Sequence, residues 1–275
     1  MRLQGATKTL LLGAALALGG CLEVPERALL SNAFAPTADC LYPSLTPFRP
    51  LPARFSVLTW NIYKQQGEWQ PELARWADGT DLLLLQEASG RERLYGWLNE
   101  RDLTWFQAAA FEWQRLPTGV LTASRGKAAQ ICAERITEPA TRIPKSLLIS
   151  RYPVRGAAEQ LLVVNLHAVN FSLRGRTYQA QLDMISRALS GHHGPVIVAG
   201  DFNRWNARRQ RLLQRWAEQE GLSEALPTPD VRTRFWGYPL DAIYYRGLTL
   251  EQAESMLSHA SDHAPLKAVF SVPSR

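Results

Sequence analysis

The sequence predicts a layered α/β sandwich built from mixed β-sheets. From residue 55 onward, short apolar runs rich in branched and aromatic residues alternate with helical patterns. Several predicted strands follow one another without a helix between them, which is not the pattern of a doubly wound parallel sheet. Five strands also run into polar side chains at one end. Because such ends can gather at one rigid edge, we expect them to form a single shared site.

The predicted elements cover most of the chain after residue 54. Strands are expected at residues 55–60, 81–86, 119–123, 145–150, 161–166, 196–199, 241–245 and 266–270. Helices are expected at residues 71–77, 91–100, 177–190 and 206–220. No repeat of fixed period is visible, so one domain over residues 54–275 is the simplest interpretation.

The first residues have the layout of a secretory signal peptide. Arg2 and Lys8 precede an apolar stretch at residues 10–18, which is shorter than the about 20 residues that span a bilayer as a helix. We therefore expect a signal peptide at residues 1–20 and an exported, periplasmic protein. The alternative is a cytoplasmic protein whose start is mis-assigned.

Cysteine positions add two expectations. Residues 18–21 resemble the lipobox of bacterial lipoproteins, whose cysteine is lipidated, so Cys21 is a candidate membrane anchor. In an oxidising compartment, Cys40 and Cys132 can then form a disulfide, although two unconnected cysteines are the alternative. A Pro-rich segment within residues 21–53 reads as a lead-in linker.

The charge of the chain restricts the substrate only weakly. The formal net charge of +6 is compatible with an anionic substrate, such as nucleic acid or a phospholipid headgroup. Arginines recur at helical spacing in the segment 206–220 and just before it, and they form either a basic track for phosphates or a solvated helix face. They are Arg204, Arg208, Arg211 and Arg215. We expect the protein to act as a monomer.

The most informative motif is the tetrapeptide Gly-Asp-Phe-Asn at residues 200–203, which follows the apolar run 196–199. A buried strand gains nothing from a carboxylate at its tip, whereas a reaction gains a base and an amide donor on one rigid edge. Asp201 is suited to orient or deprotonate a water molecule. Asn203 is suited to donate a hydrogen bond where negative charge develops.

Two other strand ends carry oxygen ligands suited to a metal ion. Glu87 emerges from the apolar run 82–86, so its carboxylate needs a partner, either a divalent cation or a salt bridge. Mg²⁺ prefers one or two carboxylates, with water and substrate phosphate completing its shell. Asn61 follows another strand and is suited to a metal-bound water or a phosphate oxygen, or is simply a turn residue.

Histidines stand at two further strand ends. His167 and Asn170 leave the predicted strand 161–166, where an imidazole and an amide can each donate to a phosphate or leaving-group oxygen. His263 precedes the last strand, and Asp241 on a neighbouring strand is our candidate to orient its imidazole. That pairing would make His263 a positive contact for phosphate.

Taken together, these motifs resemble the endonuclease/exonuclease/phosphatase superfamily, which has the deoxyribonuclease I-like fold. The matching motifs, in chain order, are Trp60-Asn61, Gln86-Glu87, His167-x-x-Asn170, Gly200-Asp201-Phe202-Asn203, Leu240-Asp241 and Ser261-Asp262-His263. The resemblance covers roughly residues 54–270 and looks closest to the YafD-like bacterial members. It implies a four-layer α/β/β/α sandwich and Mg²⁺-dependent phosphoester hydrolysis by an in-line water, with Mn²⁺ as an alternative metal.

The resemblance also implies roles for the site residues. Glu87 would be the principal metal ligand, with Asn61 and Asp262 at or near the metal. Asp201 would position the nucleophilic water and His263 would contact the scissile phosphate, although either could be the base. The remaining roles belong to Asn203 and Asn170 on phosphate oxygens, His167 on the leaving-group side and Asp241 on His263.

The sequence departs from the abasic-site endonucleases at two positions. Tyr63 stands where those enzymes carry an Asp near the metal, which leaves open whether one or two metals bind. His167 stands where they have Tyr, as in deoxyribonucleases and sphingomyelinases. A nuclease-like phosphodiesterase is therefore the leading hypothesis. A phospholipase, sphingomyelinase-type or small-molecule phosphoesterase is the alternative, and a non-catalytic binding protein is the third.

Overall fold

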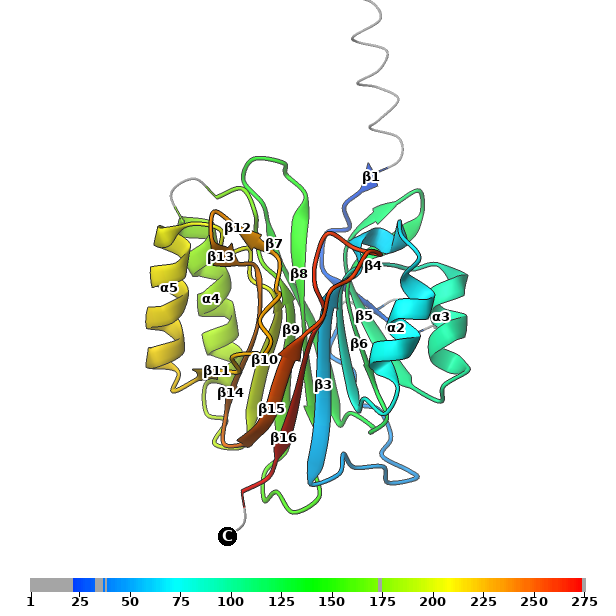
Figure 1. Ribbon diagram of the computed structural model, residues 1–275. Helices are drawn as coiled ribbons and strands as arrows, with labels where there is room; N and C mark the ends of the chain where they lie inside the picture. The colour runs from blue at the N-terminus through cyan, green and yellow to red at the C-terminus, as the bar shows by residue number, and fades with distance from the viewer. Residues whose placement is uncertain (1–21, 33–36, 38, 173–174, 274–275) are drawn as a thin grey trace, which may run out of the picture.

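The computed structural model describes residues 22–32, 37, 39–172 and 175–273. Two mixed sheets pack face to face, and a pair of helices covers the outer face of each sheet (Figure 1). This four-layer α/β/β/α sandwich confirms the predicted fold class. Among the described residues, no helix is both long enough and apolar enough to cross a membrane.

The first sheet has eight strands in the order β1-β5-β6-β4-β3-β16-β15, with β2 also paired to β5. Its strands are β1 (Leu22–Glu23), β2 (Leu29–Ser31), β3 (Arg54–Asn61), β4 (Leu82–Ser89), β5 (Thr104–Trp113), β6 (Leu116–Ser124), β15 (Thr249–Ser255) and β16 (Leu266–Ser271). Helices α2 (Trp69–Ala77) and α3 (Glu92–Asn99) cover its outer face, and the short turn η1 (Tyr63–Gln65) follows β3.

The second sheet has six strands in the order β11-β14-β10-β9-β8-β7. Its strands are β7 (Gln130–Thr137), β8 (Pro144–Tyr152), β9 (Leu161–His167), β10 (Val196–Asp201), β11 (Ser223–Glu224) and β14 (Asp241–Arg246). Helices α4 (Arg176–Leu189) and α5 (Ala207–Gln219) cover its outer face. A separate hairpin consists of β12 (Arg234–Phe235) and β13 (Tyr238–Pro239).

Three apolar layers hold the sandwich together. The central layer lies between the sheets and includes the rings of Phe55 and Phe270, whose centroids are 6.1 Å apart. Ile185 and Trp216 pack α4 and α5 against the second sheet, and Trp97 packs α3 against the first. The strands read as continuous apolar runs because these layers bury both of their faces.

Each strand and helix predicted from the sequence is present, with its ends shifted by a few residues. The prediction missed three long strands, β5, β7 and β15. In β7 and β15, half-buried or exposed polar residues interrupt the apolar pattern, and β5 contains a run of three alanines at residues 108–110. Their strand conformation is set by pairing with neighbouring strands, which local propensity does not report.

Two buried amides join the sheets near one end of the sandwich. Gln86 of β4 donates through Nε2 to Oδ1 of Asn165 in β9 at 2.8 Å, and to Oγ1 of Thr59 at 3.0 Å. Asn165 in turn donates through Nδ2 to the carbonyl of Leu121 at 2.9 Å. Because a buried amide without partners costs about 1–3 kcal/mol, this pairing favours one relative position of the two sheets.

The expected lead-in linker is packed onto the domain instead of running free. Strands β1 and β2 pair with β5, Leu41 forms a bridge to Ile131 in β7, and Leu51 forms a bridge to Val154. Residues 22–53, called here the lead-in strap, therefore contact both sheets. The predicted signal peptide and Cys21 lie outside the described residues.

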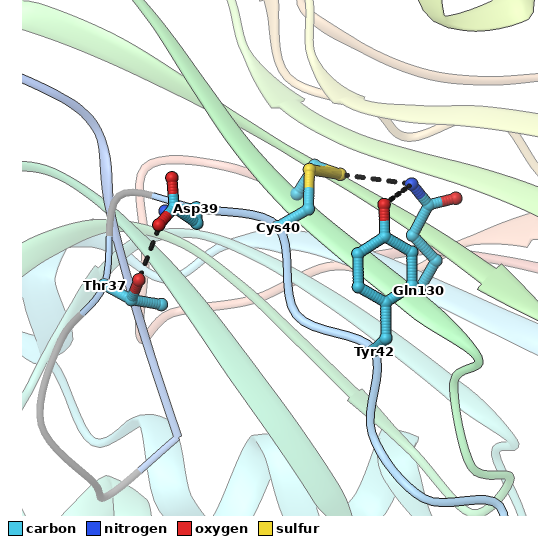
Figure 2. Close-up of a disulfide and its surroundings, with 6 residues drawn as sticks. Thr37, Asp39, Cys40, Tyr42 and Gln130 are labelled. Carbon is cyan, nitrogen blue, oxygen red and sulfur yellow. Dashed lines mark hydrogen bonds between the residues drawn. A yellow bond between two sulfur atoms is a disulfide. The ribbon is translucent and has the colours of Figure 1, made fainter.

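A disulfide fixes the lead-in strap to the second sheet. Cys40 and Cys132 are bonded, with Cα atoms 4.3 Å apart (Figure 2). Gln130 lies beside the bond, with Nε2 3.6 Å from Sγ of Cys132 and 3.3 Å from the hydroxyl of Tyr42. The disulfide joins positions 92 residues apart in the sequence, so it closes a long loop.

We expect loss of this disulfide to lower the free energy of unfolding by about 2–4 kcal/mol, because the cross-link restricts the unfolded chain. Denaturant unfolding of the double variant Cys40→Ser/Cys132→Ser measures the change. Wild-type protein in dithiothreitol should match the variant. Equal unfolding midpoints of the oxidised wild type and the double variant would contradict a stabilising role.

Candidate active site

Polar strand ends of both sheets meet at one edge of the sandwich, which we call the site edge. In the second sheet, Asp201 at the end of β10 pairs with Asp241 in β14 and with His167 in β9. In the first sheet, Asn61 at the end of β3 pairs with Gln86 of β4. The site edge therefore consists of the ends of β3, β4, β9 and β10 and the start of β14.

The backbone is strained at several points of this edge. Tyr63, Lys64 and Gln65 have φ of 48°, 52° and 56°, and Glu87 and Asn203 have φ of 51° and 47°. A non-glycine residue in this left-handed region costs on the order of 1–3 kcal/mol and persists only where the surrounding structure enforces it. Such strain often accompanies functional sites.

Gly200 brings Asp201 into place. Its φ is 145°, and a Cβ there would lie 2.0 Å from the carbonyl oxygen of Leu166 in β9. Only glycine allows β10 to approach β9 this closely at its last residues. The glycine of the tetrapeptide motif thus positions the carboxylate that follows it.

Asp201 is the buried centre of the site. Its Oδ1 accepts a hydrogen bond from the backbone N–H of Asn203 at 2.9 Å. Its Oδ2 accepts from Nδ2 of Asn61 and Nδ2 of Asn203, both at 3.2 Å. Burial raises the pKa of Asp201 to about 6, against the lowering effect of the nearby His263 charge. Asn61 and Asn203 thus hold this carboxylate in a fixed orientation.

His263 and Asp241 form a close pair beside it. Nδ1 of His263 lies 2.8 Å from Oδ2 of Asp241, and Nε2 lies 3.8 Å from Oδ2 of Asp201. Burial alone would lower the pKa of His263, but the charges of Asp241 and Asp201 and the hydrogen bond to Asp241 raise it to about 10. The ring is therefore an imidazolium at neutral pH, as the pairing predicted from the sequence requires.

His167 is in the opposite protonation state. Burial, together with the charges of Lys145, His263 and Lys64, holds the pKa of His167 well below its usual range. Its Nε2 lies 3.0 Å from Nζ of Lys145, so a neutral imidazole accepts this hydrogen bond. The same Nε2 lies 3.4 Å from Asp201 and 4.0 Å from Glu87.

Glu87 reaches the edge and already has a cationic partner. Its carboxylate is largely buried and forms an ion pair with Nζ of Lys64. Asn61 contributes an amide oxygen nearby, which accepts from the backbone N–H of Tyr63 at 3.1 Å. Buried carboxylates need compensating positive charge, and the oxygen donors at this edge suit a hard divalent cation. A metal ion bound by Glu87 would replace the ammonium of Lys64.

A second group of side chains could also hold a metal ion. Asp201, Asp241 and His263 each offer a ligand atom, and these atoms lie within 4.8 Å of one another. Nδ1 of His263 is already engaged by Asp241, however, and the pKa of His263 is raised so that it keeps its proton. Metal ligands must be deprotonated, so a metal ion bound here would have to displace the proton of His263.

Two predicted site residues lie at the periphery of this network. Oδ1 of Asn170 accepts from Nε1 of Trp205 at 2.8 Å, and its side chain faces a pocket outside the network. Asp262 is exposed, and its carboxylate lies 3.4 Å from Oγ of Ser261. Within the described residues, no hydrogen bond or ion pair joins Asp262 to Glu87. The other seven predicted residues are brought together.

An apolar pocket of about 410 Å³ opens next to Asn203. Asn170 lines it together with aromatic and aliphatic side chains, which are Phe171, Trp205, Phe235, Trp236 and Leu240. The rings of Trp205 and Trp236 meet edge to face with centroids 5.8 Å apart. The buried polar network therefore borders an apolar recess.

Sequence reasoning missed Lys64 and Lys145. Lys64 lies just after Asn61, so its place at a strand end was a usable signal. Lys145 begins β8, and only the antiparallel pairing of β8 with β9 brings it to His167. Arg204 does not belong to the expected basic track, because it is buried in ion pairs with Glu224.

The fold and this edge define a deoxyribonuclease I-like hydrolase fold with Asp201, Asp241 and His263 close together. The chain belongs to the Endonuclease/Exonuclease/phosphatase family, whose model matches residues 58–263. It is 40% identical over 254 residues to UPF0294 protein VV2535 of Vibrio vulnificus (strain YJ016), covering 91% of this chain and 89% of that protein. A UPF0294 protein of Klebsiella pneumoniae (strain 342) is 40% identical over 247 residues, covering 90% and 92%.

Solved structures share the fold at low sequence identity. The human Nocturnin catalytic domain with bound sulfate anion superposes with a TM-score of 0.65 at 19% identity, covering 85% of this chain and 97% of that chain. An endonuclease/exonuclease/phosphatase of Beutenbergia cavernae DSM 12333 has a TM-score of 0.63 at 16% identity, covering 80% and 72%.

We expect Asp241→Asn to lower the pKa of His263 from about 10 toward 6.5, because burial then opposes the imidazolium with less compensation. Titration of the imidazole by nuclear magnetic resonance measures this value. Asp262→Asn is the matched control, since Asp262 is exposed and should change the pKa of His263 little. A larger effect of the control than of Asp241→Asn would contradict the pairing.

Proposed function

We propose that this protein is a divalent-metal-dependent phosphoester hydrolase, and that its substrate is a phosphodiester. The observation that carries the proposal is the position of Asp201 at 3.8 Å from the imidazolium of His263, which is held by Asp241. A carboxylate that activates water, next to a cation that contacts phosphate, is the pair that an in-line displacement needs.

The protonation states support different roles for Asp201 and His263. A general base works best when its pKa is close to the pH of the reaction. Burial raises the pKa of Asp201 to about 6, which is close to neutral pH. His263 carries its proton at neutral pH and so cannot accept one from water. We infer that Asp201 is the base and His263 the positive contact for the scissile phosphate. Asn203 orients the base, because its amide donates to Asp201 and to the carbonyl of Ala168, which replaces the phosphate contact first expected of it.

The leaving-group side belongs to His167 and Lys145 in this proposal. His167 is neutral and accepts from Lys145, so it is not itself the donor in this arrangement. Lys145 presents the positive charge on that side. We infer that Lys145, oriented by His167, stabilises the departing oxygen, which replaces the donor role first expected of His167.

Glu87 and Asn61 would hold the metal ion in this proposal. Mg²⁺ fits the carboxylate and amide oxygens, and Mn²⁺ is the alternative. When bound, the ion would act as a Lewis acid for developing negative charge. Lys64 balances the charge of Glu87 in the structure and would become free to contact substrate. Asp262 at the rim of the edge is a further candidate ligand.

The compartment is part of the proposal. A disulfide between Cys40 and Cys132 supports export, because disulfides are rare in reducing cytosol. The predicted leader supports the same location, with Cys21 as the anchor. In that setting, nucleic acid and phospholipid headgroups are the two substrate classes to test. Hydrolysis of supercoiled DNA, RNA, sphingomyelin and inositol phosphates, with Mg²⁺ or EDTA, tests the function directly.

We expect Glu87→Gln, Asp201→Asn and His263→Ala each to lower kcat/KM by at least about 100-fold while the fold stays intact. EDTA should abolish turnover of the wild type, and added Mg²⁺ should restore it. Circular dichroism checks the fold of each variant. The exposed Arg187 near the end of α4, replaced by Gln, serves as a control for surface substitution. Near-normal activity of His263→Ala would overturn the assignment.

The pH profile follows from the two shifted pKa values. Activity should rise with pH through about 6 as Asp201 loses its proton, and fall through about 10 as His263 loses its own. Asp241→Asn should move the alkaline limb to lower pH and leave the acid limb in place or shift it slightly. An unchanged alkaline limb in this variant would exclude His263 as the group that titrates there.

A further inference from the structure

Large apolar side chains are exposed on the loops of the site edge. They are Tyr63 after β3, Trp113 at the end of β5, Phe171 after β9, Phe235 at the end of β12, Trp236 in the turn that follows it, and Leu257 after β15. We call these six side chains the apolar rim. Trp236 and Leu257 are each 73% exposed. Exposed apolar groups concentrated on one face mark a surface that binds a partner.

The start of the described chain lies at the same edge. Leu22 pairs with Trp113 at the end of β5, and β1 runs antiparallel to β5, so Leu22, the first described residue, lies beside Trp113 of the apolar rim. Figure 1 shows β1 and the β12–β13 hairpin at the same end of the sandwich. The preceding 21 residues include the apolar run 10–18 and Cys21. The predicted anchor therefore precedes, in the sequence, a residue that lies at the apolar rim.

Charge on this face suits an anionic surface. The exposed arginines on its loops and helix starts include Arg91, Arg115, Arg142, Arg176, Arg208 and Arg234, the last of which is paired with Asp230. The exposed acids near them are Glu68, Glu92 and Asp262. Membranes with anionic lipids attract such basic segments, while Trp and Tyr prefer the level of the headgroups. The site edge therefore carries both kinds of group, basic side chains and the aromatic rings of the apolar rim.

The composition of the apolar rim favours lipid over single-stranded nucleic acid. Bases need flat ring faces on which to stack, but Phe235 and Trp236 are tilted by 44° and Trp236 meets Trp205 edge to face. Leu257 offers no stacking surface at all. Side chains spread over five loops, with an aliphatic member, fit insertion into the headgroup region better.

We propose that the apolar rim docks the site edge on an anionic phospholipid surface. The phosphodiester that reaches Asp201 and His263 is then that of a lipid headgroup, and this second part rests on the proposed function. Docking itself does not depend on turnover. The domain would lie with its site edge, and with Leu22 at that edge, against the membrane.

The test uses the chain from Leu22 onward, which contains both complete sheets, the described helices and the disulfide. Flotation with vesicles of equal parts phosphatidylglycerol and phosphatidylcholine, in EDTA, measures binding without hydrolysis. We expect the wild-type segment to float and Phe235→Ala/Trp236→Ala to bind at least about tenfold more weakly. The matched control is Tyr42→Ala/Phe48→Ala, which removes exposed rings of the lead-in strap and should bind normally.

Three outcomes would decide against docking on a lipid surface. No flotation of the folded wild type, or equal loss in the control and rim variants, overturns it. Binding of a single-stranded oligonucleotide that is lost in the rim variant, without vesicle binding, assigns the apolar rim to nucleic acid. Glu87→Gln separates the two proposals, because it should float normally while losing hydrolysis. Vesicle binding without hydrolysis of any phosphodiester would support the docking surface and refute the proposed function.

Discussion

The hydrogen bond between Gln86 and Asn165 is the contact on which the geometry of the site depends. It joins the two sheets inside an otherwise apolar interface, at a length of 2.8 Å. Gln86 is followed directly by Glu87, and His167 comes two residues after Asn165. If the sheets shifted relative to each other, the two buried amides would lose their hydrogen bond. The positions of the Glu87 carboxylate and the His167 imidazole therefore depend on how the two sheets pack.

Charge balance is the second constraint at this edge. Two lysines and the imidazolium of His263 lie close to three carboxylates, which belong to Asp201, Asp241 and Glu87. The two aspartates and His263 are buried, whereas Lys64 is partly exposed. Burial alone would neutralise several of them, but each charged group has an oppositely charged partner or a hydrogen bond, as Lys145 has to the neutral ring of His167. Lys64 and Lys145 are the members whose partners a substrate or metal ion could take over. The charged side chains of the site edge lie close together because each is stabilised by its neighbours.

Most of the fold and much of the site followed from the sequence alone. The apolar runs that end in Glu87, His167 and Asp201 predicted strands, and the shared edge followed from those ends. Lys145 could not be found this way, because its contact with His167 arises from an antiparallel pairing that local pattern does not report. Arg204 was misread for a related reason. Its helical spacing with Arg208 suggested an exposed face, whereas Glu224 from another element draws it inside.

Pairing with nearby strands also explains why β5 and β7 escaped prediction. Both strands lie toward the margins of their sheets. Polar residues interrupt the apolar pattern of β7, and β5 contains a run of three alanines. Tertiary partners outside the local window decide their conformation. Asp262 illustrates the opposite limit: a motif identified its position in the sequence, but not whether its exposed carboxylate turns toward Glu87.

The lead-in strap has a consequence for where the folded unit begins. Strand β5 is hydrogen-bonded on one side to β6 and on the other to β1 and β2, which pair with it between Gln107 and Trp113. A chain cut after the strap would present that side of β5 as a row of open amide and carbonyl groups. Open sheet margins pair with other molecules, so such a fragment is prone to self-association. By covering this side of β5, the lead-in strap prevents two copies of the protein from pairing through it.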